Sequence, residues 1–527
     1  MAARIRAASR ATATVTGSTR KFGKWSKKSS TSPIAVEGAA RIGRTSDSVT
    51  VMADRIAWFR PLATKPSMID VAAALAGSAP ESDRLTFQPW VHNLGFGRGN
   101  SKVGSQTLEY RGSNPEVLMP EYIEQRWIGD PGAYGSRRSR ATFVYRAYVP
   151  DPIASFDLSL PGEVGLLVSD AEGEIRALNS GHGVHGLEAV GPLLLRAESV
   201  ASSRIEGLEL SQRNLARALF DPDAARGTAK TVAGNVRAMA EAIKIGDKNR
   251  EFRVGDIVDV HAALLADTDD DAIAGQIRTV QNWIGGRLNS PIDADFVPPP
   301  PERVPGLLDD LAAYLNRDDL PAVVQAAVAH AQFETIHPFI DGNGRVGRCL
   351  IHVVLRRRGL APNVVPPISI VLASNAKAYV NGLMSYRSGD PVEWARSFAY
   401  TSRRAAAEST VLATRIDGLI ASWHERAGKP RRGSSAAGLI DLLPAYPILD
   451  VATAQRALSV SNEAARLALR SLEETGVVQQ VTAGRYRRAW AAEDLFELLN
   501  EYEHSLATPT RAGQPRRASP DLRRSRP

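Results

Sequence analysis

The sequence contains almost no cysteine and no long apolar run. Cys349 is the only cysteine in 527 residues, which excludes intramolecular disulfides and cysteine-rich zinc sites. Because it follows a polar motif on an apolar stretch, we expect it to be a small buried hydrophobic residue. No segment approaches the roughly 18 consecutive apolar residues that a membrane span needs, and no secretory hydrophobic region is present. We therefore expect a cytoplasmic protein that does not contact a membrane.

Acidic residues are scarce at both ends of the chain. Residues 1–60 hold 12 Lys and Arg against 3 Asp and Glu, and no acid precedes Glu37. Residues 508–527 hold 6 Arg against 1 Asp. The two ends thus carry +9 and +5, which leaves −6 of the net +8 for the body between them. The pI of 9.6 is therefore weak support for nucleic-acid binding by the body itself.

Composition divides the chain into five regions. Residues 1–118 are predicted to be a disordered or irregular basic extension, to include a transit peptide, or to precede a true start at Met52, Met68 or Met119. Ordered sequence is predicted to begin near residue 119, and Pro-Arg-Arg-Gly-Ser-Ser at 430–435 reads as a linker. The remaining predicted regions are an N-terminal region at 119–210, a core at 211–425, a small C-terminal unit at 434–505 and a basic disordered tail at 506–527.

Apolar periodicity predicts a mainly α-helical fold. Apolar residues recur at intervals of three and four, and the predicted helical segments are 164–178, parts of 191–220, 228–246, 256–266, 304–316 and 321–336. Between them, residues 275–301 contain β-branched and aromatic residues, a Gly-Gly pair and a proline run. This composition predicts a small β-hairpin on the helical body.

One twelve-residue stretch, "HPFIDGNGRVGR" at 337–348, combines a base, an acid, a glycine-rich turn and two arginines. Pro338 disfavours helical geometry at the preceding histidine, and a second helix is predicted from about Gly344. Its N-terminal N–H groups and dipole form a phosphate-binding site, which Arg345 and Arg348 can complete from one helical face. An acid suits such a site if it holds a divalent cation that bridges phosphates, and a histidine can deprotonate an incoming hydroxyl.

The stretch resembles the motif of the Fic family (Fic/DOC superfamily), His-Pro-Phe-x-Asp/Glu-Gly-Asn-Gly-Arg-x-x-Arg, at every defining position. The resemblance covers about residues 120–420. It implies a helical Fic core that transfers AMP from Mg-ATP to a hydroxyl of a target protein and releases pyrophosphate. It further implies His337 as general base, Asp341 as the magnesium ligand, and a nucleotide-binding set made of Gly342, Asn343, Gly344, Arg345 and Arg348.

Two other segments agree with this family. "QNWIGG" at 281–286 with "FVPPP" at 296–300 is similar to the family's flap, which docks an extended target segment by adding a strand. The expected docking residues are Gln281, Asn282, Trp283 and Ile284. "SSRIEG" at 202–207 is similar to its inhibitory motif, with Ser202, Glu206 and Gly207 at the matching positions. Tyr379 is a candidate wall of the adenine pocket, with a core tyrosine as the alternative.

Glu206 offers a physical means of inhibition. A carboxylate can pair with a guanidinium, so a pair with Arg348 would occupy the group that binds the terminal phosphate. Its negative charge would also repel that phosphate. ATP could then enter only in an unproductive pose.

The C-terminal unit is predicted to be helix, turn, helix and two strands, which resembles a winged helix-turn-helix. The expected DNA-phosphate contacts are Arg466 and Arg470 on the second helix and Arg485, Arg487 and Arg488 on the wing. A protein-docking or dimerisation module of the same fold is an equal alternative.

Three functional hypotheses follow. The first is a self-inhibited protein adenylyltransferase that uses ATP and Mg²⁺. The second is a DNA-binding regulator whose Fic core senses nucleotide. The third is a Fic enzyme that transfers another nucleotide or removes AMP. The target protein, its acceptor residue and the formation of a homodimer are left open by the sequence.

Overall fold

The computed structural model describes residues 121–130, 132, 136–180, 186–247, 249–286, 290–483 and 487–507. Their secondary structure is mainly helical, as the sequence predicts. Two parts are distinguished within the chain, and each is described by itself: residues 129–141 with 284–296 form the first, and the other described residues form the second. The predicted basic extension at 1–118 and residues 508–527 of the predicted tail lie outside the described residues.

The second part begins with an antiparallel β-hairpin that sequence periodicity did not predict. Its strands are β1 (Glu121–Trp127) and β2 (Phe143–Val149), paired from Glu121 opposite Val149 to Trp127 opposite Phe143. The helices that follow are α4 (Gly162–Ser180), α5 (Gly186–Ile205), α6 (Gln212–Phe220), α7 (Thr228–Gly246), α8 (Val254–Leu265), α9 (Val304–Leu315), α10 (Ala322–Ile336), α11 (Asn343–Arg357), α12 (Ile368–Ser374), α13 (Ala376–Arg387) and α14 (Pro391–Arg426). Short 3₁₀ turns lie at Pro222–Ala224, Asp271–Ile273 and Pro301–Arg303.

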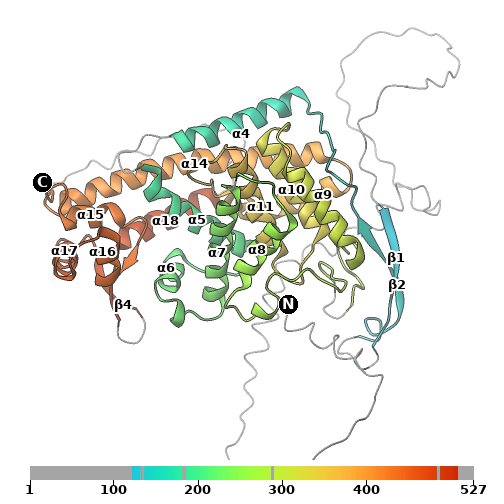
Figure 1. Cartoon of the computed structure of the whole chain (residues 1–527), viewed down its shortest axis with the longest axis horizontal. Helices are drawn as coiled ribbons and strands as arrows, with labels where there is room; N and C mark the ends of the chain where they lie inside the picture. The colour runs from blue at the N-terminus through green and yellow to red at the C-terminus, as the bar shows by residue number, and fades with distance from the viewer. Residues whose placement is uncertain are drawn as a thin grey trace, which may run out of the picture. The chain divides into compact units, whose positions relative to one another are not determined.

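Helix α10 lies at the centre of the core. Each of its residues is buried. Most are small or apolar, and polar ones such as Gln325 and His330 form hydrogen bonds inside the core. It packs against α9, α11 and α14, and α11 packs in turn against α7 (Figure 1). Cys349 is fully buried in this core, as expected.

The break between α10 and α11 is held by two residues with positive φ. His337 ends α10 with φ 51° and ψ 59°, and Gly342 precedes α11 with φ 84°. Proline has no N–H and restricts the residue before it, so Pro338 ends the helix there. The predicted start of the second helix is confirmed, one residue early, at Asn343.

The regular hairpin predicted for residues 275–301 is not formed in the described residues. The second part contains one isolated bridge from this segment, Ile277 with Phe339, and the first part contains another, Ile284 with Phe296. Gly285 and Gly286 both have positive φ, and the prolines at 298–301 lack the N–H that a ladder needs. The chain therefore turns where the sequence predicts, but only isolated bridges form in place of paired strands.

The C-terminal module spans residues 434–507 and contains two helices and a hairpin where the sequence predicts them. Its elements are α15 (Ser435–Leu442), β3 (Ile448–Leu449), α16 (Val451–Leu458), α17 (Asn462–Glu474), β4 (Gln479–Ala483), β5 (Arg487–Ala491) and α18 (Glu493–Ala507). The sheet order is β3-β5-β4, antiparallel throughout. The side chains of Ser434, Asp450 and Ser461 cap α15, α16 and α17.

Side chains join this module directly to α5 and α6. The carboxylate of Glu503 on α18 accepts hydrogen bonds from Arg204 (2.7 Å) and Gln212 (2.6 Å). Arg213 pairs with Glu493 at 2.6 Å. Arg196 on α5 donates to the carbonyls of Pro444 (2.8 Å) and Ala445 (3.0 Å). The module is therefore attached to the core at the helix that carries the predicted inhibitory motif.

Among the helices in the described ranges, none combines the length and apolar character required to cross a membrane.

Candidate functional site

The His337 side chain lies in an environment that keeps it neutral. Burial lowers its pKa to about 3, and the positive charges of Arg387 and Arg278 act in the same direction. Its Nδ1 is buried and has no hydrogen-bond partner among the described residues. A neutral imidazole can accept a proton, so His337 is in the state that a general base requires at neutral pH.

Arg345 provides hydrogen-bond donors that the protein leaves unused. Its Nη2 donates to Asp341 Oδ2 at 2.9 Å, and its side chain is 4% exposed. Its Nε and Nη1 are buried and have no partner among the described residues. Buried charged donors are rarely left unsatisfied in native proteins, and a guanidinium fork matches phosphate oxygens. This corner of the site is therefore suited to an anion.

The loop before α11 is held by a side chain from inside the motif. The amide of Asn343 accepts from the backbone N–H of Phe339 and donates to the carbonyl of the same residue, both at 2.8 Å. Its side chain therefore shapes the loop, and its contribution to a phosphate would be a backbone N–H. The first N–H groups of a helix lack internal acceptors, so Gly342, Asn343 and Gly344 lie where a phosphate can be bound.

His261 on α8 also holds this loop, which sequence analysis did not predict, because in the sequence it is only a histidine on an apolar helix. The N–H of Gly275 donates to its Nδ1 at 3.0 Å, which leaves the proton on Nε2. That Nε2–H donates to the carbonyl of Asp341 at 3.0 Å. Burial lowers the pKa of His261 to about 4, and its ring stacks on Phe339 with a centroid distance of 3.7 Å. The neutral tautomer is thus fixed by its two partners.

Helices α5 and α11 meet through a regular set of side chains on three successive turns. Glu198 accepts from His352 (3.0 Å), and both are fully buried. One turn later, Ser202 accepts from Arg348 through its hydroxyl (2.9 Å to Nε) and its carbonyl (2.8 Å to Nη2). One turn later again, Glu206 lies against Gly344. The antiparallel register of the two helices therefore places the last residues of α5 at the start of α11.

The pairing of Glu206 with Arg348, expected from the sequence, is present with a single bond. Arg348 Nη2 donates to Glu206 Oε1 at 2.8 Å, with side chains that are 1% and 39% exposed. Burial alone would lower the pKa of Arg348, but the negative charge of Glu206 raises it well above its ordinary value. A β-carbon on Gly344 would lie 2.0 Å from Glu206 Oε1, so only glycine permits this approach. Gly207, with φ 77°, allows the chain to leave α5 directly after the acid.

A buried polar cluster lies behind Arg348. The hydroxyl of Tyr379 lies 2.9 Å from His330 Nε2, and the tyrosine ring packs against Trp394. Burial raises the pKa of Glu334 to about 7, and the charge of Arg348 opposes that rise. Tyr379, predicted as a wall of the adenine pocket or as a core tyrosine, is 6% exposed. This position favours the second alternative.

The residues predicted to dock a target are mostly engaged with the protein itself. Gln281 donates to the carbonyls of Asn282 (3.0 Å) and Pro298 (2.9 Å). Asn282 donates to carbonyls of the motif. Trp283 packs edge-to-face on Trp127 with a centroid distance of 5.5 Å. Ile284 belongs to the first part of the chain, where it pairs with Phe296.

The structure describes the side chains of three of the five arginines predicted to contact DNA. Arg466 forms a forked pair with Glu463, at 2.7 and 3.0 Å. Arg470 and Arg488 are exposed, and together with Arg466 they line a pocket of about 390 Å³. Arg485 and the side chain of Arg487 lie outside the described residues.

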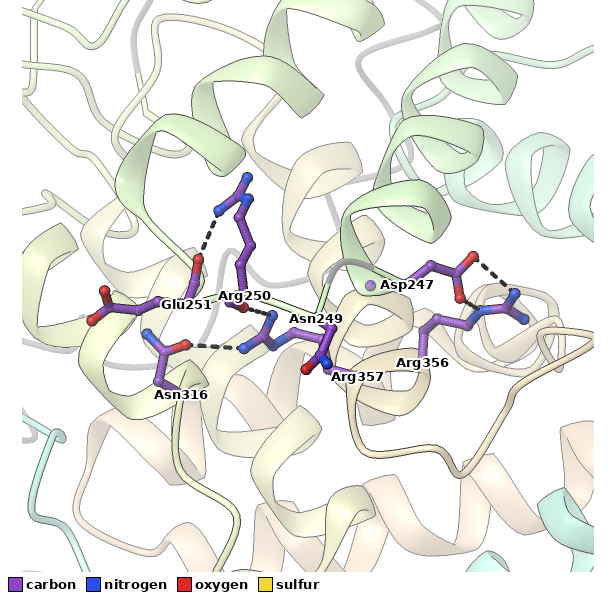
Figure 2. A pocket seen from close by; sticks show the side chains of 8 residues that line it. Asp247, Asn249, Arg250, Glu251, Asn316, Arg356 and Arg357 are labelled. Carbon is purple, nitrogen blue, oxygen red and sulfur yellow. Dashed lines mark hydrogen bonds and ion pairs between the residues drawn. The ribbon is translucent and has the colours of Figure 1, made fainter.

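A larger arginine-lined pocket, of about 590 Å³, lies at the opposite end of α11 from the motif. Figure 2 shows that its arginines are already engaged. Arg356 is paired with Asp247, and Arg357 donates to Asn316 Oδ1 (3.0 Å) and to the carbonyl of Arg250 (2.9 Å). Among the described residues, Arg345 has buried donors without a partner and these arginines have none that are buried, so the motif is the better anion site.

A magnesium ion would have one protein ligand here. Among the residues that the structure describes, no group of three or more His, Cys, Asp or Glu is placed to hold a metal. Mg²⁺ bound with a nucleotide commonly takes one or two carboxylates, with phosphates and water as its other ligands. The Asp341 carboxylate is 26% exposed beside the unused donors of Arg345, so its position fits that donor set.

Comparison with known proteins places the motif in a described family. Residues 251–355 match the Fic/DOC family model. Over 125 residues the chain is 33% identical to protein adenylyltransferase fic-1 of Caenorhabditis briggsae, which covers 23% of each chain. Over 97 residues it is 37% identical to a probable protein adenylyltransferase of Aquifex aeolicus, covering 18% of this chain and 28% of the other.

The comparison with solved structures finds a Fic family protein from Desulfovibrio desulfuricans, with 22% identity, a TM-score of 0.41, and coverage of 64% of this chain and 97% of that chain. Fic-1 from C. elegans gives 24% identity and a TM-score of 0.38, covering 47% and 71%. The chain spans less than a third of the length of the curated relatives named above. The motif of residues 337–348 falls inside the matched region, and the chain therefore contains a Fic/DOC domain.

Proposed function

We propose that this chain is a self-inhibited protein adenylyltransferase. In the reaction, His337 accepts the proton of a target hydroxyl, and the hydroxyl oxygen attacks the α-phosphorus of ATP. A phosphorus–oxygen bond forms, the bond to the β-phosphate breaks, and pyrophosphate leaves. The names of the curated relatives, protein adenylyltransferases, support this activity over the matched region.

The observation that carries the proposal is the pair of unused donors on Arg345, in the same twelve-residue motif as the neutral His337. A buried guanidinium with free N–H groups at a helix N-terminus favours phosphate. A neutral imidazole in the same motif favours proton abstraction. Each group alone has a structural explanation, but together they are suited to a phosphoryl substrate and a hydroxyl acceptor.

Magnesium is proposed to bind Asp341 together with the nucleotide. When bound, the ion neutralises phosphate charge and orients the phosphates. The chain's own contribution is to hold the Asp341 backbone through His261 and its carboxylate through Arg345. Asp341→Ala should remove the magnesium dependence of labelling along with most of the activity.

The inhibition is proposed to act through Glu206. Its carboxylate pairs with Arg348 and lies over Gly344. It therefore occupies both the guanidinium and the space that the terminal phosphate of ATP would use. It also adds like charge, which repels that phosphate. ATP must therefore displace the carboxylate before it can be correctly placed.

The test is labelling with differently labelled ATP. The Glu206→Gly protein is incubated with Mg²⁺ and either α-³²P or γ-³²P ATP, with and without cell lysate. Label from the α position alone, lost in Glu206→Gly/His337→Ala, is the expected result. Label from the γ position would instead show a kinase. Parallel reactions with labelled GTP, CTP and UTP test transfer of another nucleotide, and incubation with AMP-labelled protein tests removal of AMP.

A DNA-binding regulator is the second candidate. The order α15-β3-α16-α17-β4-β5 with sheet order β3-β5-β4 supports a winged helix, with α17 as the helix that would enter the groove. Charge weakens the case for DNA, because residues 434–507 contain 6 Arg against 10 Asp and Glu. Arg466 is also neutralised by Glu463. These features favour a protein-docking or dimerisation role.

Two measurements separate these roles. Fluorescence anisotropy with duplex DNA should show binding that falls steeply between 50 and 200 mM salt if the module is a DNA reader. Light scattering reports whether the chain forms a homodimer. A cytoplasmic location is part of the proposal, because ATP and Mg²⁺ are plentiful there.

A further inference from the structure

The backbone of His337 is held in an unfavourable conformation. Its φ of 51° and ψ of 59° place it in the left-handed region, which costs a non-glycine residue free energy and persists only where neighbours enforce it. In this conformation the His337 carbonyl accepts hydrogen bonds from two side chains outside α10. The atoms that hold this carbonyl therefore determine where the imidazole is presented.

Arg278 is the first group that holds it. Its Nε donates to the His337 carbonyl at 2.9 Å, and its Nη2 donates to Pro299 (2.6 Å) and, more weakly, to Ile336 (3.4 Å). Its backbone N–H donates to the Pro338 carbonyl at 2.9 Å. Arg278 is 3% exposed, and the hydrogen-bond partners of its side chain in the described residues are backbone carbonyls.

A buried cation bonded to carbonyls is costly to place. The free energy lost when a charge leaves water is offset only when its N–H donors meet well-aligned acceptors. Burial lowers the pKa of Arg278 to about 10, so it remains charged at neutral pH. A neutral apolar residue would fill the same space without this cost, which indicates that the guanidinium is needed for the carbonyls it binds.

Asn282 is the second group. Its Nδ2 donates to the carbonyls of His337 (3.2 Å) and Phe339 (2.9 Å), and it is 7% exposed. It therefore spans Pro338 and fixes the backbone on both sides of it. The sequence predicted Asn282 as a residue that docks the target, but its amide nitrogen is directed into the motif.

The structure assigns Arg278 and Asn282 as positioning residues that clamp the His337 carbonyl and so aim the catalytic imidazole. The assignment rests on the proposed function, because it presumes that His337 acts as the base. Misplacing a reacting group by about 1 Å can cost roughly 10²-fold in rate. Loss of the clamp should therefore slow transfer and leave nucleotide binding, which uses α11 and its arginines, nearly unchanged.

The experiment compares two buried asparagines of the same kind. Asn282→Asp keeps the shape and removes the Nδ2 donor. Asn179→Asp is the matched control, since Asn179 is also 7% exposed and donates to two backbone carbonyls, of Ile175 (2.9 Å) and Val364 (3.1 Å), away from the motif. Both are placed in the Glu206→Gly protein. Autolabelling, labelling of several lysate proteins and the half-saturating ATP concentration are measured.

We expect Asn282→Asp to lower the labelling rate roughly 10- to 100-fold for every acceptor, with half-saturating ATP changed less than threefold. Asn179→Asp should lower the melting temperature and leave the rates within twofold. Loss that differs between acceptors would show that Asn282 docks targets, and an unchanged rate would show that it positions nothing; either outcome overturns the assignment.

Two further controls keep the outcomes distinct. If Asn282→Asp does not fold, Arg278→Lys, which keeps the charge but not the fork, should show the same loss of rate at unchanged half-saturating ATP. A normal rate in that variant also overturns the assignment. If the parent Glu206→Gly protein labels nothing, the proposed function has failed. If the parent labels and only the variants disagree with expectation, the clamp has failed.

Discussion

Arg348 Nη2 lies 2.8 Å from Glu206 Oε1 while its Nε lies 2.9 Å from Ser202 Oγ, so one guanidinium binds two residues of the same α5 motif. Four-residue spacing places Ser202 and Glu206 on one helical face, which is why both reach a single arginine. The guanidinium proposed to bind the terminal phosphate is thus already bound at both edges.

Removing the acid should activate the protein. Glu206→Gly is expected to label itself and lysate proteins roughly 10- to 10³-fold faster than wild type, because partly buried ion pairs of this kind couple by a few kcal/mol. The double variant Glu206→Gly/Arg348→Ala should not be activated, since relief matters only if the arginine is there to receive the phosphate. Equal labelling by wild type and a well-folded Glu206→Gly would remove the inhibitory role.

Removing the hydroxyl of Ser202 should activate weakly. Ser202→Ala leaves the buried Nε of Arg348 without its acceptor, which costs about 1–3 kcal/mol and loosens the arrangement that Glu206 completes. We expect the labelling rate to rise roughly 2- to 10-fold, which corresponds to the lower part of this free-energy range. Ser203→Ala is the matched control, because Ser203 is equally buried but bonds Ser199 and Asn235 instead. Activation by both variants to the same extent would indicate general loosening of α5.

The link between the C-terminal module and α5 should also affect inhibition. Glu503→Ala removes the acceptor of Arg204 and Gln212, which frees the end of α5 that carries Glu206. We expect labelling to rise about 2- to 5-fold, the effect of one partly exposed pair worth up to about 1 kcal/mol. Glu501→Ala is the control on the same helix, since Glu501 pairs with Arg415 at the surface of α14. Its rate should match wild type. An unchanged rate in Glu503→Ala would show that the module does not reach the site.

Acid should destabilise the fold through buried histidines and stabilise it through Glu334. Burial lowers the pKa of His330 to about 3. Between pH 6.5 and 3 the histidine is therefore protonated in the unfolded chain but neutral in the folded protein, and the free energy of unfolding falls as pH falls. Glu334, with its pKa raised to about 7, binds a proton in the fold between pH 7 and 4.5, so its contribution rises as pH falls. Each effect is roughly 2 kcal/mol between pH 7 and 5.

Urea unfolding at pH 7 and pH 5 tests both signs. His330→Gln should lose less stability than wild type on acidification, and Glu334→Gln should lose more. A shift in the same direction for both variants would contradict the assignment of opposite pKa changes to the two residues.

The sequence was most informative where the relevant contacts are local. The order of residues 337–348 determines a helix, a break and a second helix, because proline and glycine restrict the backbone whatever surrounds them. The contact between Glu206 and Arg348 was also predicted, since the resemblance supplied the partner and helical spacing supplied the face. The Asn343 side chain, which braces its own loop, was predicted to bind nucleotide, because both uses fit the same spacing.

The sequence was least informative where a side chain meets a distant part of the chain. His261 and Asp341 are 80 residues apart, and Arg278 and His337 are 59 apart; periodicity carries no information about such partners. For Tyr379, the sequence left a pocket wall and a core residue as equal readings, because an aromatic on an amphipathic helix fits both. Asn282 was assigned to target docking by resemblance to the family's flap, and the sequence does not show the direction of its amide group.

Helix α14 contributes to both the core and the C-terminal module. Its 36 residues extend over about 54 Å at 1.5 Å per residue, and Figure 1 shows it running from α10 to α15. Its final turns bury Ile416, Ile420 and Trp423, and Trp423 donates to Asp494 of α18 at 3.1 Å. Cutting the chain at residues 430–435 would therefore uncover an apolar stripe on the remaining piece. The core and the module therefore share the burial of one helix, and neither can bury the end of α14 alone.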